Sequence, residues 1–132
     1  MMTSDESPLV LVADDDQLLR AILEHKLVKA GYRFVGVTNG QEALQSAREL
    51  KPSAIVLDAM MPVLDGFEAL RRLKADPAYR NTVVIMLTAL KRDEDVVAGL
   101  REGAADYLSK PFNPDELLVR LARLLPEAPP SS

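Results

Sequence analysis

The sequence contains no cysteine and no tryptophan, and only 5% of its residues are aromatic. Without cysteine, neither a disulfide framework nor a thiolate metal site can form. Long hydrophobic runs are also missing, since the apolar stretches are far too short to span a bilayer. The first residues carry acids and no basic stretch, unlike a secretory signal. These absences predict a cytoplasmic protein with no membrane partner.

The 132 residues, 48% of them hydrophobic, suit one compact domain with its own core. A formal net charge of -4 provides no general attraction to nucleic acid, so we expect no direct nucleic-acid partner. We predict a flexible N-terminal tail at residues 1–8, a single domain at 9–125, and a C-terminal tail or linker, PEAPPSS, at 126–132.

Short apolar runs alternate five times with segments of helical period. This alternation is typical of an α/β, doubly wound protein, in which helices cover both faces of a parallel sheet. Asp16, Asn39 and Asn113 are placed to cap helices, and Gly31 and Pro52 to end them. The expected strands are 9–13, 34–37, 54–57, 83–87 and a short one at 107–108, and the last helix should bury Leu117, Leu118, Leu121, Leu124 and Leu125.

Polar residues follow the carboxyl ends of four of these strands, the edge where open α/β sheets gather function. Asp58 is the leading candidate for the reacting group, because a carboxylate at a buried strand tip is well placed to meet water, metal or phosphate. The other strand ends carry Asp14-Asp15-Asp16, Thr88-Ala89 and Lys110-Pro111-Phe112.

Clustered carboxylates repel one another, and a hard divalent cation such as Mg²⁺ is the usual relief. The acidic triplet 14–16 alone would indicate only helix capping, which is the role we expect for Asp16. Together with Asp58, Thr88 and Lys110, however, the triplet supplies metal ligands, a nucleophile, a hydroxyl donor and a cation. This set matches phosphoryl transfer onto a carboxylate.

Four motifs carry a family resemblance: VADDD at 12–16, LDAMMP with DG at 57–66, LTA at 87–89 and DYLSKPF at 106–112. In this order they resemble the receiver domain of bacterial two-component response regulators, in the chemotaxis-protein-Y-like superfamily, and linked motifs are more specific than any one alone. The resemblance covers roughly residues 9–125. It implies a (βα)5 flavodoxin-like sandwich with five parallel strands in the order 2-1-3-4-5.

By this resemblance Asp58 is the phosphoacceptor for a phosphoryl group carried on a histidine of a partner kinase or a histidine phosphotransfer protein. Asp15, Asp58 and the Met60 carbonyl would bind Mg²⁺ directly, and Asp14 would hold it through water. We expect the metal and Lys110 to keep the pKa of Asp58 low.

The resemblance also implies a switch. Thr88 and Lys110 would contact the new phosphoryl oxygens and pull the loop after strand four inward, and Tyr107 would swap rotamers to report the change on the face of helix four, strand five and helix five. The Lys110-Pro111 bond is expected to be cis. The protein would catalyse its own phosphorylation and dephosphorylation and would not turn over an external substrate.

Two positions suggest a long-lived phosphoryl group. Met60 and Leu90 are apolar where other members of the family carry groups that orient attacking water. We therefore expect slow self-dephosphorylation.

The output is open, either an unknown partner or a fused effector domain. Asp106, Glu116 and Arg120 resemble part of a dimer face, but Val96 and Ala105 replace its usual charges, so a homodimer is one alternative.

Two other functions compete with the receiver interpretation. A phosphohydrolase of the haloacid-dehalogenase type would use Asp14 as nucleophile, but it leaves Asp58 unused and finds only Asp115-Glu116, in a helix start, as its further acidic pair. A pseudo-receiver would only dock partners. The only histidine, His25, is expected on the surface, and the charged run 91–95 at a helix start.

Overall fold

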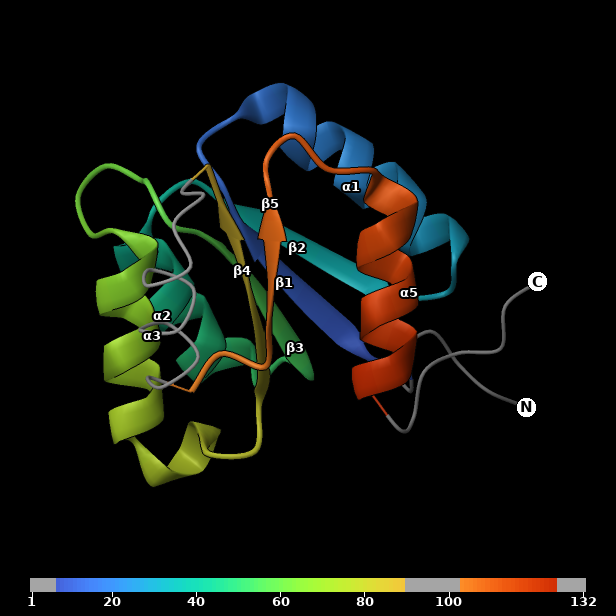
Figure 1. Ribbon diagram of the computed structural model, residues 1–132. Coiled ribbons are helices and arrows are strands. Elements are labelled where there is room, and N and C mark those ends of the chain that lie inside the picture. The colour runs from blue at the N-terminus through green and yellow to red at the C-terminus, as the bar shows by residue number, and fades with distance from the viewer. Residues whose placement is uncertain (1–6, 90–102, 126–132) are drawn as a thin grey trace.

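The computed structural model describes residues 7–89 and 103–125 (Figure 1). The predicted helix start at 91–95, Leu90 and Val96 lie outside these ranges. The elements, in chain order, are β1 (Leu9–Ala13), α1 (Gln17–Lys29), β2 (Arg33–Val37), α2 (Gly40–Leu50), β3 (Ala54–Asp58), α3 (Gly66–Ala75), the 3-10 helix η2 (Pro77–Tyr79), β4 (Val83–Thr88), β5 (Asp106–Ser109) and α5 (Pro114–Leu124).

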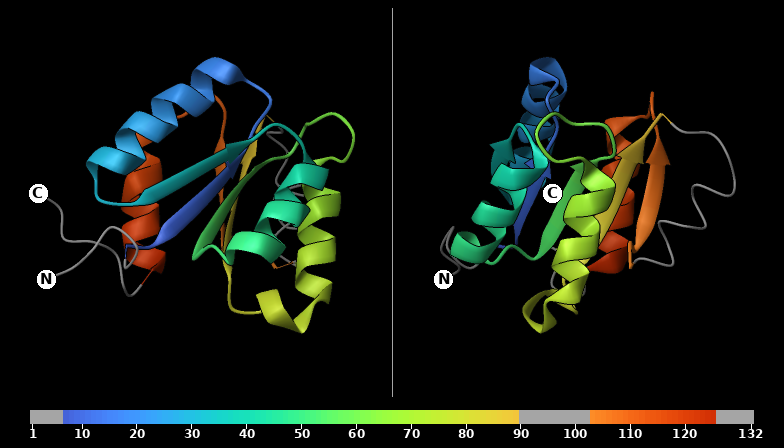
Figure 2. Two further views of the ribbon diagram at one scale, coloured as in Figure 1. Left: turned by 180° about the vertical axis from the view of Figure 1, so that it is seen from behind. Right: turned by 90° about the vertical axis from the view of Figure 1, so that its left-hand side faces the viewer.

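The five strands form one parallel sheet in the order β2-β1-β3-β4-β5, which confirms the predicted doubly wound, flavodoxin-like architecture. Helices α1 and α5 cover one face and α2 and α3 cover the other (Figures 1 and 2). No helix within the described ranges is both long and apolar enough to cross a membrane.

The core consists of two apolar layers, one on each face of the sheet. Successive side chains of a strand point to opposite faces, so Val10 and Val12 of β1 pack toward α1 and α5 while Leu11 and Ala13 pack toward α2 and α3. Strands β1 and β3 are buried along their whole length, as continuous apolar runs in a parallel sheet should be. Of the predicted α5 core residues, Leu117, Leu121 and Leu125 are buried, and Leu118 and Leu124 are half-buried against the same layer.

Strand β1 has the predicted bounds, and the other four strands are one or two residues longer than predicted, which concerns the site. Strand β3 includes Asp58, whose register partner is Leu87, and β4 includes Thr88, whose partner is Ser109. Both polar residues are therefore the last residues of strands, held by ladder pairing, and not the first residues of loops. The caps at Asp16, Asn39 and Asn113 are as predicted.

Two glycines allow the loop after β3 to fold back against the sheet edge. A Cβ on Gly66 would lie 2.1 Å from the Asp58 carbonyl oxygen, and one on Gly40 would lie 2.3 Å from the Leu64 carbonyl oxygen. Both contacts are with backbone atoms, which cannot move aside as a flexible side chain could. Glycine at the start of α2 and of α3 thus permits the close packing that surrounds the tip of β3.

We predict that Gly66→Ala lowers the free energy of unfolding by about 3 kcal/mol, because the added methyl overlaps the backbone of β3. Gly36→Ala is the matched control, since a Cβ there meets only side-chain atoms of Phe34 and Arg20, at 3.1 Å or more. The control should change stability by about 1 kcal/mol or less. Urea denaturation of both variants measures the difference, and equal stabilities would contradict this account of the loop.

Candidate functional site

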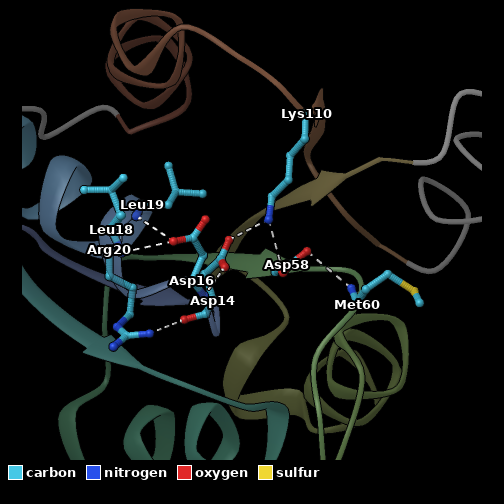
Figure 3. A network of polar contacts seen from close by, with 8 residues as sticks. All are labelled: Asp14, Asp16, Leu18, Leu19, Arg20, Asp58, Met60 and Lys110. Atoms are coloured by element: carbon cyan, nitrogen blue, oxygen red, sulfur yellow. Dashed lines mark hydrogen bonds and ion pairs between the residues drawn. The ribbon is translucent and has the colours of Figure 1, made fainter.

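The carboxyl ends of β1, β3 and β4 bring three buried polar side chains to one edge of the sheet. Asp14 is fully buried, Asp58 is 5% exposed and Thr88 is 1% exposed. Lys110 extends toward Asp14 and Asp58 from the loop after β5 (Figure 3). The predicted site residues therefore lie together, because parallel strands present their carboxyl ends at a common edge of the sheet.

Three carboxylates lie close enough together to share a cation. Oxygens of Asp14, Asp15 and Asp58 all fall within 4.8 Å of one another. Asp15 is exposed, so the cluster opens to solvent, and the Met60 amide donates a hydrogen bond to Asp58 Oδ1 at 3.3 Å. This donor set, made only of oxygens and carrying negative charge, fits a hard divalent ion such as Mg²⁺.

Lys110 joins two of the carboxylates. Its Nζ lies 2.9 Å from Asp14 Oδ2 and 3.2 Å from Asp58 Oδ2. The Lys110 amide donates to the Thr88 carbonyl at 2.8 Å, so β4 and the loop after β5 are tied together beside the site. The Lys110-Pro111 bond is cis, as predicted. Although burial opposes it, the two carboxylates raise the pKa of Lys110, so the side chain stays charged at neutral pH.

Tyr107 lies on β5, in register with Met86 of β4. The side chain is half-buried, packs against the α2 and α3 layer, and has its hydroxyl oxygen buried. The ring therefore points inward in this structure. Its predicted switch role, like the predicted role of Thr88, remains a prediction.

Without a metal, Lys110 alone does not keep the pKa of Asp58 low, and the expected effect of the metal together with Lys110 stays a prediction. Burial, followed by the negative charge of Asp14, raises the pKa of Asp58, and these effects outweigh Lys110 and the Met60 amide. Burial is the largest cause, and Lys110, which is shared between two acids, offsets it only in part. A divalent cation would lower the electrostatic cost of ionising this carboxyl group.

Two features near the site were not predicted from the sequence. Arg20 donates from Nη1 to the Asp14 carbonyl at 2.7 Å. An open groove of about 380 Å³ lies beside Lys110, with apolar walls from Leu18, Leu19, Ile22 and Phe112. The sequence does indicate the groove, because α1 carries apolar residues around most of its circumference and cannot bury them all. Leu18 is accordingly 70% exposed. His25 is exposed, as expected.

We predict that Asp58→Asn raises the free energy of unfolding at pH 7 in magnesium-free buffer, because it removes a buried charge. A folded-state pKa above the unfolded value penalises the folded protein once the acid is ionised, and the penalty vanishes below the pKa of an unfolded aspartate, about 3.9. The gain should therefore shrink as the pH falls through the acid range.

Urea denaturation with a chelator at neutral and acid pH measures this effect. Asp115→Asn, which changes an exposed carboxylate of α5, is the control and should give no gain. A variant at Asp58 less stable than the wild type at pH 7 would show that Lys110 fully compensates the charge.

Comparison with known proteins agrees with this geometry. The family model of the response regulator receiver domain matches residues 10–122. The chain is 46% identical over 125 residues to the transcriptional regulatory protein PrrA of Mycobacterium tuberculosis, covering 95% of this chain and 53% of PrrA. It spans about half the length of the curated relatives that it matches.

Solved structures show the same fold. The receiver domain of the Francisella response regulator 1452 superposes with a TM-score of 0.85 at 39% identity, covering 90% of this chain and 97% of that one. The receiver domain of sensor histidine kinase PA1611 from Pseudomonas aeruginosa, with magnesium in its active-site cleft, has a TM-score of 0.81 at 34% identity, covering 90% and 98%. The motifs, the sheet order and these matches together show that the chain belongs to the response regulator receiver domains.

Proposed function

We propose that this chain is a phosphorylation-dependent switch in which Asp58 accepts a phosphoryl group from a histidine of a partner kinase or phosphotransfer protein. Phosphorylation-dependent signalling is the general function of the family. The observation that carries the proposal is the setting of Asp58, a buried carboxylate with Lys110 at 3.2 Å and two further carboxylates beside it. A structural role alone would not favour such concentrated charge.

In the proposed reaction an Asp58 carboxylate oxygen attacks the phosphorus atom. The bond from phosphorus to the donor histidine nitrogen breaks, and the electron pair leaves with the imidazole. Lys110 and the Thr88 hydroxyl then donate hydrogen bonds to phosphoryl oxygens, which requires Lys110 to turn from its present carboxylate partners. The reaction is self-modification, so the chain is not a turnover enzyme.

Receiver domains bind Mg²⁺ at an acidic pocket, and we propose the same for this chain. Asp15, Asp58 and the Met60 carbonyl would hold the ion directly, with Asp14 acting through water. The grouping of the three carboxylates and the magnesium reported in the PA1611 receiver domain support this assignment. When bound, the ion would neutralise charge on the carboxylates and on the incoming phosphoryl group.

The groove beside Lys110 is suited to docking the phosphodonor. Leu18 and Ile22 of α1 are exposed apolar residues, and Phe112 completes the wall next to the lysine. We propose that apolar side chains of the donor protein occupy this groove and bring its phosphohistidine to Asp58. Such a contact would supply the positioning that phosphoryl transfer needs.

The output would follow from movement of Thr88 toward the phosphoryl group and from a rotamer swap of Tyr107, which would change the surface of β5 and α5. PrrA is a transcriptional regulatory protein about twice as long as this chain, so a fused effector domain or an unknown output partner would respond to this surface. A cytoplasmic location remains a prediction.

A homodimer through this surface is less favoured by the ion pairs. Arg120 already binds Asp106 at 2.5 Å and Glu116 at 3.5 Å within the same chain. These are the charges that the resemblance assigns to a dimer face. Dimerisation would have to break them or share them.

We predict that Asp58→Asn abolishes labelling by acetyl phosphate with Mg²⁺, because it removes the nucleophile. Asp14→Asn should slow labelling by about 10- to 100-fold while leaving the label on Asp58. Intact-protein mass spectrometry and peptide mapping measure both.

The opposite pattern, with label on the Asp58 variant and none on the Asp14 variant, would favour the phosphohydrolase. A wild-type protein that binds neither Mg²⁺ nor beryllofluoride would favour a pseudo-receiver.

We also predict that Met60→Asn shortens the phosphoryl half-life by about tenfold, because a positioned amide can orient the attacking water where the thioether cannot. Met60 is 67% exposed, so the change should not disturb the core. Val63→Asn is the matched control on the same loop, since Val63 is 80% exposed and its φ of 69° suits asparagine. An unchanged phosphoryl half-life in Met60→Asn would contradict the idea that the apolar Met60 side chain slows hydrolysis.

A further inference from the structure

We infer that Arg20 is a positioning residue, which holds the turn between β1 and α1 in the shape that the proposed divalent cation requires. This inference rests on the proposed function, because it concerns the same acidic cluster. Arg20 donates its hydrogen bond to the main-chain carbonyl of Asp14 and not to a carboxylate of the cluster.

Arg20 reaches this turn because of where it lies on α1. It follows the first turn of the helix, and helical side chains tilt toward the N-terminus, so a long side chain there extends back over the preceding loop. Its Nη1 donates to the Asp14 carbonyl at 2.7 Å, a charge-assisted hydrogen bond (Figure 3). The side chain is half-buried, so water screens the contact only in part.

With this contact, every polar group of the fully buried Asp14 has a partner. The amide donates to the Val37 carbonyl at 3.1 Å, Oδ1 accepts from the Asp16 amide at 2.8 Å, and Oδ2 accepts from Lys110 at 2.9 Å. Removing the guanidinium would leave a buried carbonyl without this donor, which is costly, so the peptide group would be expected to turn.

A turn of that peptide group would displace the proposed ligand Asp15. The Asp14 carbonyl and the Asp15 amide belong to one planar unit, so the direction of the carbonyl sets the direction in which the Asp15 backbone starts. Asp15 is exposed and has no burial to fix it independently. Arg20 thereby aligns a carboxylate that it does not touch.

The neighbours of Arg20 hold it in this position. Its stem crosses β2 at Gly36, where an added Cβ would lie 3.4 Å from Arg20 Cδ. Glu42 of α2 is close enough that the Arg20 charge, after hydrogen bonds from Thr38, contributes to lowering the pKa of Glu42. The guanidinium is therefore placed by packing and by charge.

Charge and positioning predict opposite effects on Mg²⁺ affinity. Arg20→Met removes a cation near the site, so Coulomb repulsion alone predicts tighter Mg²⁺ binding. Positioning predicts weaker binding, because Asp15 loses its alignment. The sign of the change therefore separates the two.

The experiment is calorimetric titration of the whole chain with MgCl₂ at constant ionic strength. We expect Arg20→Met to raise the Mg²⁺ dissociation constant about tenfold, and Arg20→Lys, which keeps the charge and a donor, to recover part of the loss. Arg48→Met removes an exposed arginine near the end of α2 and should bind like the wild type. If Arg20→Met does not fold, Gly36→Val, which crowds the Arg20 stem without removing its charge, should weaken binding in the same direction.

Thermal unfolding without Mg²⁺ provides the second readout. A lower melting temperature with unchanged or tighter Mg²⁺ binding in the folded Arg20→Met variant would reduce Arg20 to a structural residue and overturn the inference. If Arg20→Met does not fold, unchanged Mg²⁺ binding in Gly36→Val would also overturn the inference. A wild-type protein that does not bind Mg²⁺ would instead overturn the proposed function, and this inference with it.

Discussion

Repulsion among carboxylates at the tips of β1 and β3 is the constraint on which the site depends. Asp14 and Asp58 are buried and Asp15 adds a third charge within 4.8 Å, while Lys110 supplies one positive charge between the two buried acids. Burial, followed by the charge of Asp14, raises the pKa of Asp58 in spite of Lys110. The fold thus carries an electrostatic cost at this edge of the sheet. A divalent cation would relieve that cost, and the relief would contribute to the free energy of cation binding.

The rest of the structure holds this unfavourable cluster in place through main-chain contacts. Ladder pairing fixes Asp58 opposite Leu87, the Lys110 amide binds the Thr88 carbonyl, and Gly66 lets α3 begin against the Asp58 carbonyl. Repulsion alone would move the three acidic side chains apart. Backbone hydrogen bonds and close packing of the main chain keep them together. The scaffold thus holds the three acids together in spite of their mutual repulsion, which the ion pairs of Lys110 reduce only in part.

The α/β class and the residues gathered at the sheet edge were predictable from local sequence patterns, whereas the strand order was implied only by the family resemblance. Alternating apolar runs locate the strands, and parallel strands place Asp14, Asp58 and Thr88 at one edge whatever the details. The strand ends, the direction of the Asp58 pKa shift and the Arg20 contact were not predictable, since each depends on contacts between distant segments. Pairing with β4 lengthens β3, burial outweighs Lys110, and the reach of Arg20 depends on the peptide plane of Asp14.

Lys110 forms part of the groove and also binds the two buried acids. Two equilibria, donor docking and the placement of this ammonium group, therefore share one side chain. Thermodynamic linkage is reciprocal: if the donor protein prefers the groove with Lys110 turned toward the acids, moving Lys110 onto a phosphoryl group must weaken donor docking by the same factor. A single lysine would then make product release a built-in result of the transfer itself.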